Sequence, residues 1–162
     1  MAPAFSPVDR VYHLTYRTAY RMMRMYWALL HPLTHGALVA IWFEGEILLV
    51  RNSYVRYYSL PGGYVRRDES GRHAALRELS EETGVHARPD DLRQVVDLHH
   101  QWEGKREHIE IFELDPPARP GIQIDNREVI DASFFSPERA LSLDLFPPIR
   151  QAIEARLARM KR

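Results

Sequence analysis

Residues 63–85 read GYVRRDESGRHAALRELSEETGV, and this stretch decides the fold class of the chain. It follows Pro61 and begins in a glycine-rich loop in which the backbone can bend freely. A helix is predicted from about Arg72 to Thr83, because Ser70 is a suitable N-cap and Gly84 stands where a left-handed C-cap is expected. The stretch therefore indicates a loop that leads directly into a capped helix.

Three glutamates lie close together on this predicted helix. Glu78 and Glu82 are four residues apart and share one face, and Glu81 lies beside them. Like charges at this spacing repel each other. The opposite face, which we expect to pack on a sheet, is apolar at Ala75, Leu76 and Leu79. Clustered carboxylates without His or Cys suit a hard cation, so the sequence predicts a Mg²⁺ or Mn²⁺ site.

The same residues resemble the signature box of the Nudix hydrolases. Every specified position of that box is present, as Gly63-x5-Glu69-x7-Arg77-Glu78-Leu79-x-Glu81-Glu82-x-Gly84-Val85. The resemblance covers roughly residues 36–160 and implies an α/β fold, the Nudix-type α/β/α sandwich with a mixed β-sheet. It also implies an enzyme, a divalent-metal-dependent pyrophosphohydrolase that cleaves a nucleoside diphosphate linked to another moiety.

The resemblance also implies roles for the box residues. Glu78 and Glu82 would be metal ligands, Glu81 a ligand or a water-orienting group, and the main-chain carbonyl of Gly62 a further ligand. These three glutamates are the expected catalytic residues. Structural roles are expected for Gly63, Glu69, Arg77 and Gly84, with Glu69 and Arg77 pairing to hold the loop against the helix.

The general base is open at this point. In the family it is either a box glutamate or an acid further along the chain, and the candidates here are Glu107, Glu110 and Glu113. Glu110 stands in the outward phase of an alternating strand pattern, which is equally typical of an ordinary exposed residue.

Arginines and tyrosines around the glycine-rich loop are candidates for holding the substrate. Arg51, at the end of a predicted strand, and Arg66 are expected to bind phosphate oxygens, which suit the guanidinium fork. Tyr64 is expected to stack on a base. Residues of the same types nearby are Arg56, Arg67, Tyr54, Tyr57 and Tyr58.

The markers that distinguish some Nudix subfamilies are absent. Shortly past the box, many ADP-ribose hydrolases carry a proline and many dinucleoside polyphosphate hydrolases a tyrosine, but this chain has Gln101 and Trp102. The leaving group therefore stays open. Two alternatives also remain: a Nudix-fold module that senses a nucleotide without cleaving it, and a membrane-surface hydrolase of a lipid-linked diphosphate.

The N-terminal region lies outside the resemblance. We therefore predict an amphipathic helical extension at residues 1–35 and a Nudix hydrolase domain at residues 36–162. Residues 10–30 combine arginines with aromatic residues and methionines at helical spacing. The favoured interpretation is packing against the domain or a second subunit, which would make a homodimer, and contact with a membrane surface is the alternative.

Composition adds limits to these predictions. The formal net charge of the 162 residues is zero, so no global attraction to polyanions and no specific nucleic-acid binding are expected. The chain has no cysteine, which excludes disulfides and thiolate chemistry and suits a reducing cytoplasm. The partner that the Nudix resemblance implies is a small nucleotide.

Further strands and helices are predicted on both sides of the box. Turn residues and apolar runs predict a hairpin formed by residues 37–43 and 46–51, followed by a short strand at residues 57–60. They also predict a second hairpin formed by residues 92–102 and 108–114, and a last strand at residues 128–135. A short helix is predicted to open at Ser136 and an arginine-rich terminal helix at Pro147.

Overall fold

The computed structural model describes residues 6–161, and in this part of the chain six strands form one mixed sheet. The strands are β1 (Leu33–Phe43), β2 (Glu46–Asn52), β3 (Gly62–Tyr64), β4 (Arg93–Trp102), β5 (Lys105–Leu114) and β6 (Val129–Phe135). Their order is β4-β5-β1-β2-β6, and β3 pairs with β1 off this path. β1 runs parallel to β5, whereas the other paired strands are antiparallel.

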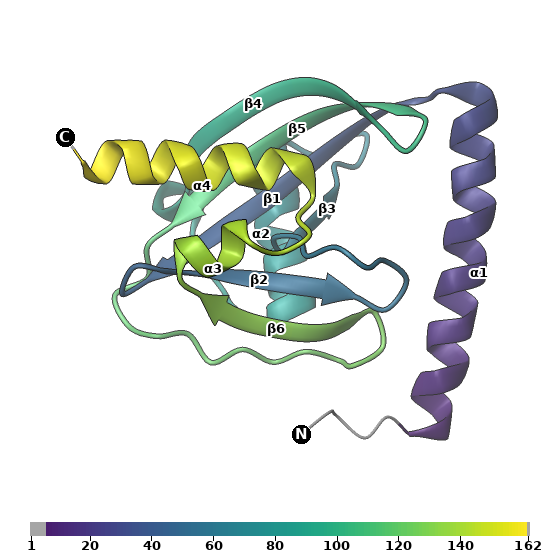
Figure 1. Cartoon of the computed structure of the whole chain (residues 1–162), viewed down its shortest axis with the longest axis horizontal. Coiled ribbons are helices and arrows are strands. Elements are labelled where there is room, and N and C mark those ends of the chain that lie inside the picture. The colour runs from purple at the N-terminus through teal and green to yellow at the C-terminus, as the bar shows by residue number, and fades with distance from the viewer. Residues whose placement is uncertain (1–5, 162) are drawn as a thin grey trace.

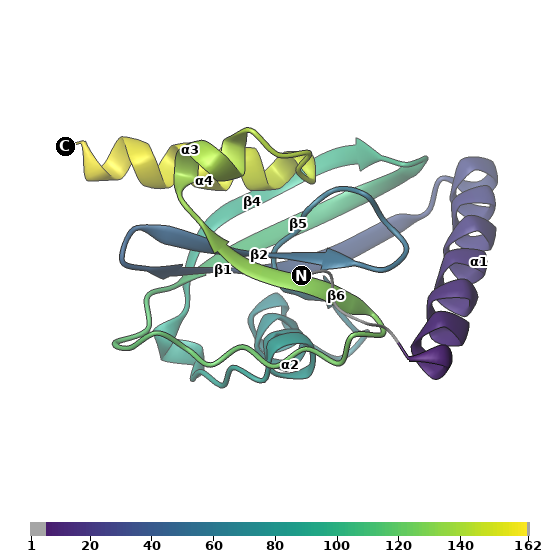
Figure 2. The same ribbon diagram turned by 60° about the horizontal axis from the view of Figure 1, so that its bottom comes forward.

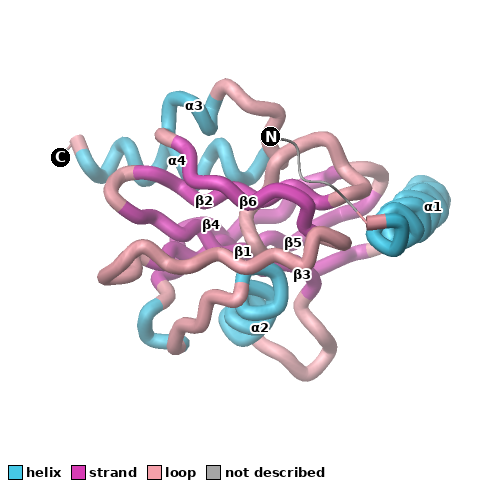
Figure 3. Tube along the Cα trace, turned by 90° about the horizontal axis from the view of Figure 1, so that it is seen from below, coloured by secondary structure: helices cyan, strands magenta, loops and turns pink. Residues whose placement is uncertain are grey.

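Helices cover both faces of this sheet. The helices of the described chain are α1 (Pro7–Leu30), α2 (Gly71–Thr83), α3 (Pro137–Leu141) and α4 (Pro147–Met160), with a 3-10 turn at Pro89–Asp91. α2 lies on one face and α3 and α4 on the other, while α1 stands at the side of the sandwich (Figures 1, 2 and 3). The expected α/β/α sandwich with a mixed sheet is confirmed.

The strand β1 lies between two apolar cores. The side chains of Leu38, Ala40 and Trp42 belong to the core under α4, and those of Ala37, Val39 and Ile41 to the core under α2. Successive side chains of a strand point to opposite faces, so a strand covered on both sides must be apolar throughout. This explains the unbroken apolar run that predicts the strand.

The segment between β2 and α2 differs from the prediction. Residues 57–60 do not form a strand; in that segment Tyr58 and Ser59 make isolated bridges. β3 instead forms in the stretch predicted as a loop, and it pairs with residues 36–38 of β1. The pairing of β1 with β2 is limited to the hairpin end. The first half of β1 is therefore open on that edge and accepts β3.

The helix α2 begins and ends at its predicted caps. The Ser70 hydroxyl accepts a hydrogen bond from the His73 N–H (3.3 Å). Gly84 has a φ of 69° and its N–H donates to the Ser80 carbonyl (3.0 Å). These caps fix the register of the helix that carries the box glutamates.

One narrow face of α1 packs on the domain. Trp27, which is 4% exposed, and His13 are its buried side chains. The His13 ring nitrogen Nε2 lies 2.8 Å from the Asn126 carbonyl, and the Tyr20 hydroxyl donates to Glu103. The structure thus shows the helix packed against the domain, which is one of the arrangements expected.

The opposite face of α1 is apolar and exposed. Val11 is 65% exposed, Met22 67%, Met25 74% and Leu29 78%. Among the described residues no helix is long and apolar enough to cross a membrane. Contact with a membrane surface or with a second copy through this face stays a prediction.

Candidate active site

β3 and α2 meet at the two glycines that precede and begin the box. The Gly62 N–H donates a hydrogen bond to Glu82 Oε2 (2.9 Å). A Cβ on Gly63 would lie 2.6 Å from the carboxyl carbon of Glu78, and a Cβ on Gly62 would lie 2.7 Å from Leu38 Cα. Glycine is required at position 62, because a Cβ there would meet the backbone of β1, whereas a Cβ on Gly63 would displace the Glu78 carboxylate.

Arg77 ties the loop to the helix. Its Nε and Nη2 atoms donate to the two oxygens of Glu69, both at 3.0 Å, and Nη2 also donates to the Tyr64 carbonyl (3.1 Å). Its Nη1 atom donates to Glu78 (2.6 Å) and Glu81 (3.3 Å). The hydrogen bonds between Arg77 and Glu69 raise the pKa of the guanidinium and lower that of the carboxyl, so both stay charged. This is the contact expected for the pair.

Glu82 has the most perturbed carboxyl group of the box. Its side chain is half-buried, and the carboxyl itself is enclosed by protein atoms. Burial raises the pKa of Glu82 to about 8; the Gly62 N–H opposes this shift, and the charges of Glu128 and Glu78 add to it. The group therefore lies in surroundings where only a cation or a proton relieves its charge.

Glu128 is a further carboxylate whose charge acts on Glu82, together with that of Glu78, and the sequence did not identify it. It lies just before β6, and β6 pairs with β2 so that Asn52 faces Val129. The Tyr54 hydroxyl donates to Glu128 Oε1 (3.0 Å) and accepts from Asn52 Nδ2 (2.9 Å). Burial raises the pKa of Glu128, with Glu78 adding to the shift against the Tyr54 hydrogen bond. Its position as the first residue of a predicted strand is the only signal in the sequence, and it does not point to catalysis.

Glu107 is the one base candidate from the sequence that lines the same cavity as Glu82. It is 4% exposed and forms an ion pair with Lys105, and the His100 Nε2 atom lies 3.1 Å from its Oε2 atom. Its charge is therefore already compensated.

Glu110 and Glu113 lie outside that cavity. Glu110 Oε2 lies 2.8 Å from His35 Nε2, and Glu110 also accepts a hydrogen bond from Gln94 (2.9 Å). Glu113 is 1% exposed and is ion-paired with three arginines, Arg93, Arg156 and Arg159. These partners explain why both carboxylates lie inside the protein, so neither position requires a catalytic role.

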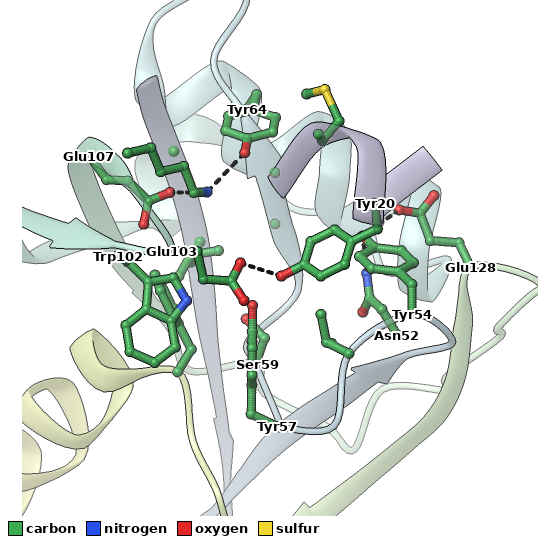
Figure 4. A pocket seen from close by; sticks show the side chains of 18 of the residues that line it. Tyr20, Asn52, Tyr54, Tyr57, Ser59, Tyr64, Trp102, Glu103, Glu107 and Glu128 are labelled. Carbon is green, nitrogen blue, oxygen red and sulfur yellow. Dashed lines mark hydrogen bonds and ion pairs between the residues drawn. The ribbon is translucent and has the colours of Figure 1, made fainter. Parts of the chain in front are cut away.

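A cavity of about 310 Å³ lies between α1 and the sheet. Glu128 and Tyr54 line one side of it and Glu107 and Trp102 the opposite side, with Tyr64 also in the wall (Figure 4). This volume and the mixture of aromatic and charged groups suit a small polar ligand with a flat ring.

Lys105 supplies the positive charge of the cavity. It is 7% exposed, its Nζ atom lies 4.3 Å from the centroid of the Trp27 ring, and it donates to the Tyr64 hydroxyl (2.9 Å). Burial alone would lower the pKa of Lys105, but Tyr64 and Glu107 outweigh it and raise the pKa. Four glutamates also line the cavity, namely Glu82, Glu103, Glu107 and Glu128.

The structure does not bring the three predicted substrate-binding residues together. Tyr64 lines the cavity, and Arg51 lines a second cavity next to it. Arg66 is exposed on the loop before α2, where its backbone N–H donates to Glu69 (3.2 Å). Their roles in binding stay predictions.

The donors of this site suit a hard cation. Within residues 6–161, no three carboxylate or imidazole groups are already drawn around one point. Arg77 pairs with Glu78, whereas Glu82 has no cationic partner in this part of the chain. An enclosed oxygen-only set with uncompensated negative charge is the environment that Mg²⁺ or Mn²⁺ prefers.

The chain matches the family model described as NUDIX domain over residues 32–156, which is most of its length. Together with the sandwich and the complete box, this match shows that the chain belongs to the Nudix hydrolase family. The helix α1 lies before the matched residues.

The sequence and the fold are similar to those of several known proteins. The MutT protein from Methanosarcina mazei Go1 is 26% identical with a TM-score of 0.65, over 83% of this chain and 99% of that chain. A putative 8-oxo-dGTP diphosphatase of Bacillus subtilis (strain 168) is 47% identical over 55 residues, which are 33% of this chain and 37% of that protein. The putative ADP-ribose pyrophosphatase YjhB of the same organism is 37% identical over 60 residues, which are 37% of this chain and 29% of that protein. The chain thus spans about a third of the curated relatives it matches.

Proposed function

We propose that the protein is a divalent-metal-dependent pyrophosphohydrolase that cleaves a nucleoside diphosphate linked to another moiety. One observation carries this proposal: the enclosed carboxyl of Glu82, held by the Gly62 N–H beside Glu78 and Glu128, lines a cavity of ligand size. A module that only senses a nucleotide has no need for an uncompensated buried carboxyl group, which costs stability.

The box glutamates would hold the cation. Glu78 and Glu82 are the proposed ligands, with Glu81 and the Gly62 carbonyl as further oxygen donors. A bound Mg²⁺ or Mn²⁺ neutralises diphosphate oxygens and lowers the pKa of a bound water. Arg77 keeps the loop and the helix in the arrangement that presents these donors.

Glu128 is the proposed general base in place of the three candidates from the sequence. It lies near Glu82, its raised pKa suits proton transfer, and the Tyr54 hydroxyl orients it. It would accept a proton from the attacking water, which adds to one phosphorus while the bridging oxygen leaves with the other product. Tyr64 and Trp102 line the cavity and are the proposed contacts for the base of the nucleotide.

The test is a panel of nucleotides incubated with Mg²⁺, with Mn²⁺ and with EDTA, and analysed by chromatography. The panel includes 8-oxo-dGTP, ADP-ribose and diadenosine tetraphosphate, because proteins named for these compounds are among the similar ones. We expect cleavage that depends on the metal, and the product pair identifies the phosphorus attacked.

Variants assign the activity to the site. We expect Glu82→Gln to lower kcat by about 10³-fold and Glu128→Gln by about 10²-fold, since each removes a charge that acts on the reacting centre. Glu154→Gln, on the exposed surface of α4, is the matched control and should leave kcat unchanged. Full activity in Glu82→Gln would refute the proposed mechanism.

The exposed face of α1 supports two further proposals on partners. A membrane surface or a second copy would cover Val11, Met22, Met25 and Leu29, which are more than half exposed. Flotation with anionic liposomes tests the first and sedimentation velocity the second. A monomer that stays with the aqueous phase contradicts both.

A cytoplasmic location is a proposal that rests on the lack of cysteine.

A further inference from the structure

A second cavity, of about 540 Å³, lies between α1 and the segment that follows β2. Figure 1 shows α1 standing beside the loop that leaves β2 at this place. We call this cavity the arginine groove, because five arginines line it: Arg17, Arg21, Arg24, Arg51 and Arg56. Glu103 is the single acidic residue of its lining within the described chain.

The contacts of these arginines leave most of their charge uncompensated. Arg17 Nε donates to the Ser53 carbonyl (3.0 Å), and the Arg24 Nε atom lies 3.8 Å from Glu103. Arg21 and Arg56 are exposed and have no ion pair with any described residue. Like charges gathered around one cavity repel each other, and an anion in the groove would relieve this repulsion.

The arginine groove and the active-site cavity differ in the sign of their charge. Four glutamates and one lysine line the cavity, whereas five arginines and one glutamate line the groove. The formal net charge of the whole chain is zero, so this separation is local. Phosphate groups that are not neutralised by a cation in the cavity are therefore better placed in the groove.

The two cavities are adjacent. Tyr20, Tyr54, Val55, Tyr57 and Glu103 line both of them. The hydroxyl of Tyr54 donates to Glu128 in the active site, and the same residue lines the groove. Tyr54 thus lies between the proposed catalytic carboxylates and the arginines as one of the five shared residues.

We propose that the arginine groove binds phosphate groups of an extended substrate, beyond the linkage that is cleaved beside Glu82 and Glu128. This assignment rests on the proposed function, and it names the substrate class as an oligophosphate with more than two phosphates in its chain. Three of the five arginines belong to α1, which precedes the family match at residues 32–156. The extension is therefore part of the substrate site and not only a packing element.

The first arm of the test measures binding of inorganic tripolyphosphate in EDTA by titration calorimetry, so that neither metal nor turnover is involved. We expect the wild-type protein to bind it and Arg21→Gln/Arg56→Gln to bind it at least 10-fold more weakly. Arg10→Gln/Arg150→Gln, which removes two exposed arginines outside the groove, should stay within twofold of the wild type. No binding by the wild type, or equal binding by the two double variants, would overturn the proposal.

The second arm compares diadenosine tetraphosphate with ADP-ribose under excess Mg²⁺. For Arg21→Gln/Arg56→Gln we expect KM to rise at least 10-fold with the tetraphosphate, with kcat within twofold, and no change with ADP-ribose. Weaker tripolyphosphate binding without any change in KM would show that the groove takes free oligophosphate, and would overturn the substrate assignment. Absence of turnover on every compound would refute the hydrolase and the substrate assignment together, while the first arm would still decide whether the groove binds phosphate.

Discussion

Glu82 is a carboxyl group whose local surroundings oppose its charge. The Gly62 N–H is its hydrogen-bond donor, and Glu78 and Glu128 are its charged neighbours. A sequence pattern places Glu82 on a helix face, but its pKa depends on which groups from other elements approach it.

We predict a pH-dependent stability difference between Glu82→Gln and the wild type in EDTA. The folded pKa of Glu82, about 8, lies above the ordinary glutamate value of 4.5. The contribution of protonated Glu82 to the free energy of unfolding is therefore fully present below pH 4.5 and is lost as the pH rises through 8. At pH 9 the variant should be more stable than the wild type, by at most about 5 kcal/mol. Urea unfolding at pH 4, 7 and 9 measures the difference, and a constant difference over this range would show that the pKa is not raised.

We predict that Gly63→Ala impairs catalysis more than it impairs folding. The new Cβ would lie 2.6 Å from the carboxyl carbon of Glu78, so that this carboxylate must move. Such a displacement should lower kcat/KM by about 10²-fold. At Gly121 a Cβ meets nothing within 4 Å, so Gly121→Ala is the control, with unchanged kinetics. Equal kcat/KM values for the two variants would contradict the close approach of β3 to α2.

Among the elements, α1 is the helix whose two faces differ most in exposure. Its inner face contacts the domain through Trp27, Tyr20 and His13, and its outer face is exposed. Only two of its described side chains, those of His13 and Trp27, are buried. Trp27 is the largest of them, and it lies against the Lys105 ammonium and the Tyr20 ring.

We predict that Trp27→Ala detaches α1, whereas Met25→Ala does not. Trp27 is 4% exposed and Met25 74%, although both are large and two residues apart. Loss of a buried tryptophan costs about 3 kcal/mol, which raises the open population about a hundredfold. The rate of tryptic cleavage at Arg17, Arg21 and Arg24 measures this opening. Equally slow cleavage of both variants would mean that other contacts hold the helix.

At the scale of the whole molecule, the sandwich and α1 should differ in local stability. The strands β1 and β2 and the second half of β5 are mostly buried on both faces, while α1 buries only Trp27 and His13 among its described residues. Elements with few buried apolar contacts open at a lower free energy than the core.

We predict that hydrogen exchange is faster in α1 than in β1 and that ligand binding slows it. In the proposed binding mode, a non-hydrolysable oligophosphate nucleotide with Mg²⁺ would contact α1 from the cavity and the groove, so it should add protection there and little in β1. Mass spectrometry of exchanged peptides measures both regions. Equal protection of α1 and β1 without ligand would contradict the marginal attachment of the helix, and unchanged protection on binding would contradict its place in the substrate site.

Most strands and helices of the core follow from local patterns; β3 and the 3-10 turn were missed, and the strand predicted at residues 57–60 does not form. The apolar run of β1, the turn after it and the caps Ser70 and Gly84 each specify structure within a few residues. β3 was missed because its partner edge exists only where β1 and β2 separate, which depends on the twist and pairing of the sheet. The 3-10 turn at Pro89–Asp91 was missed as well, since such a short piece has no periodicity.

The sequence by itself determined the helix with its three glutamates, because this helix depends on spacings within one continuous stretch, and the resemblance of that stretch to the Nudix box implied the family and its sandwich. The tertiary structure alone decided that β6 pairs with β2 and brings Glu128 beside Glu82. It also decided that α1 lies beside the loop after β2, so that its arginines face Arg51 and Arg56. The physical reason is that contacts between distant segments are set by strand pairing and packing summed over many residues, and no local pattern of residues carries that information.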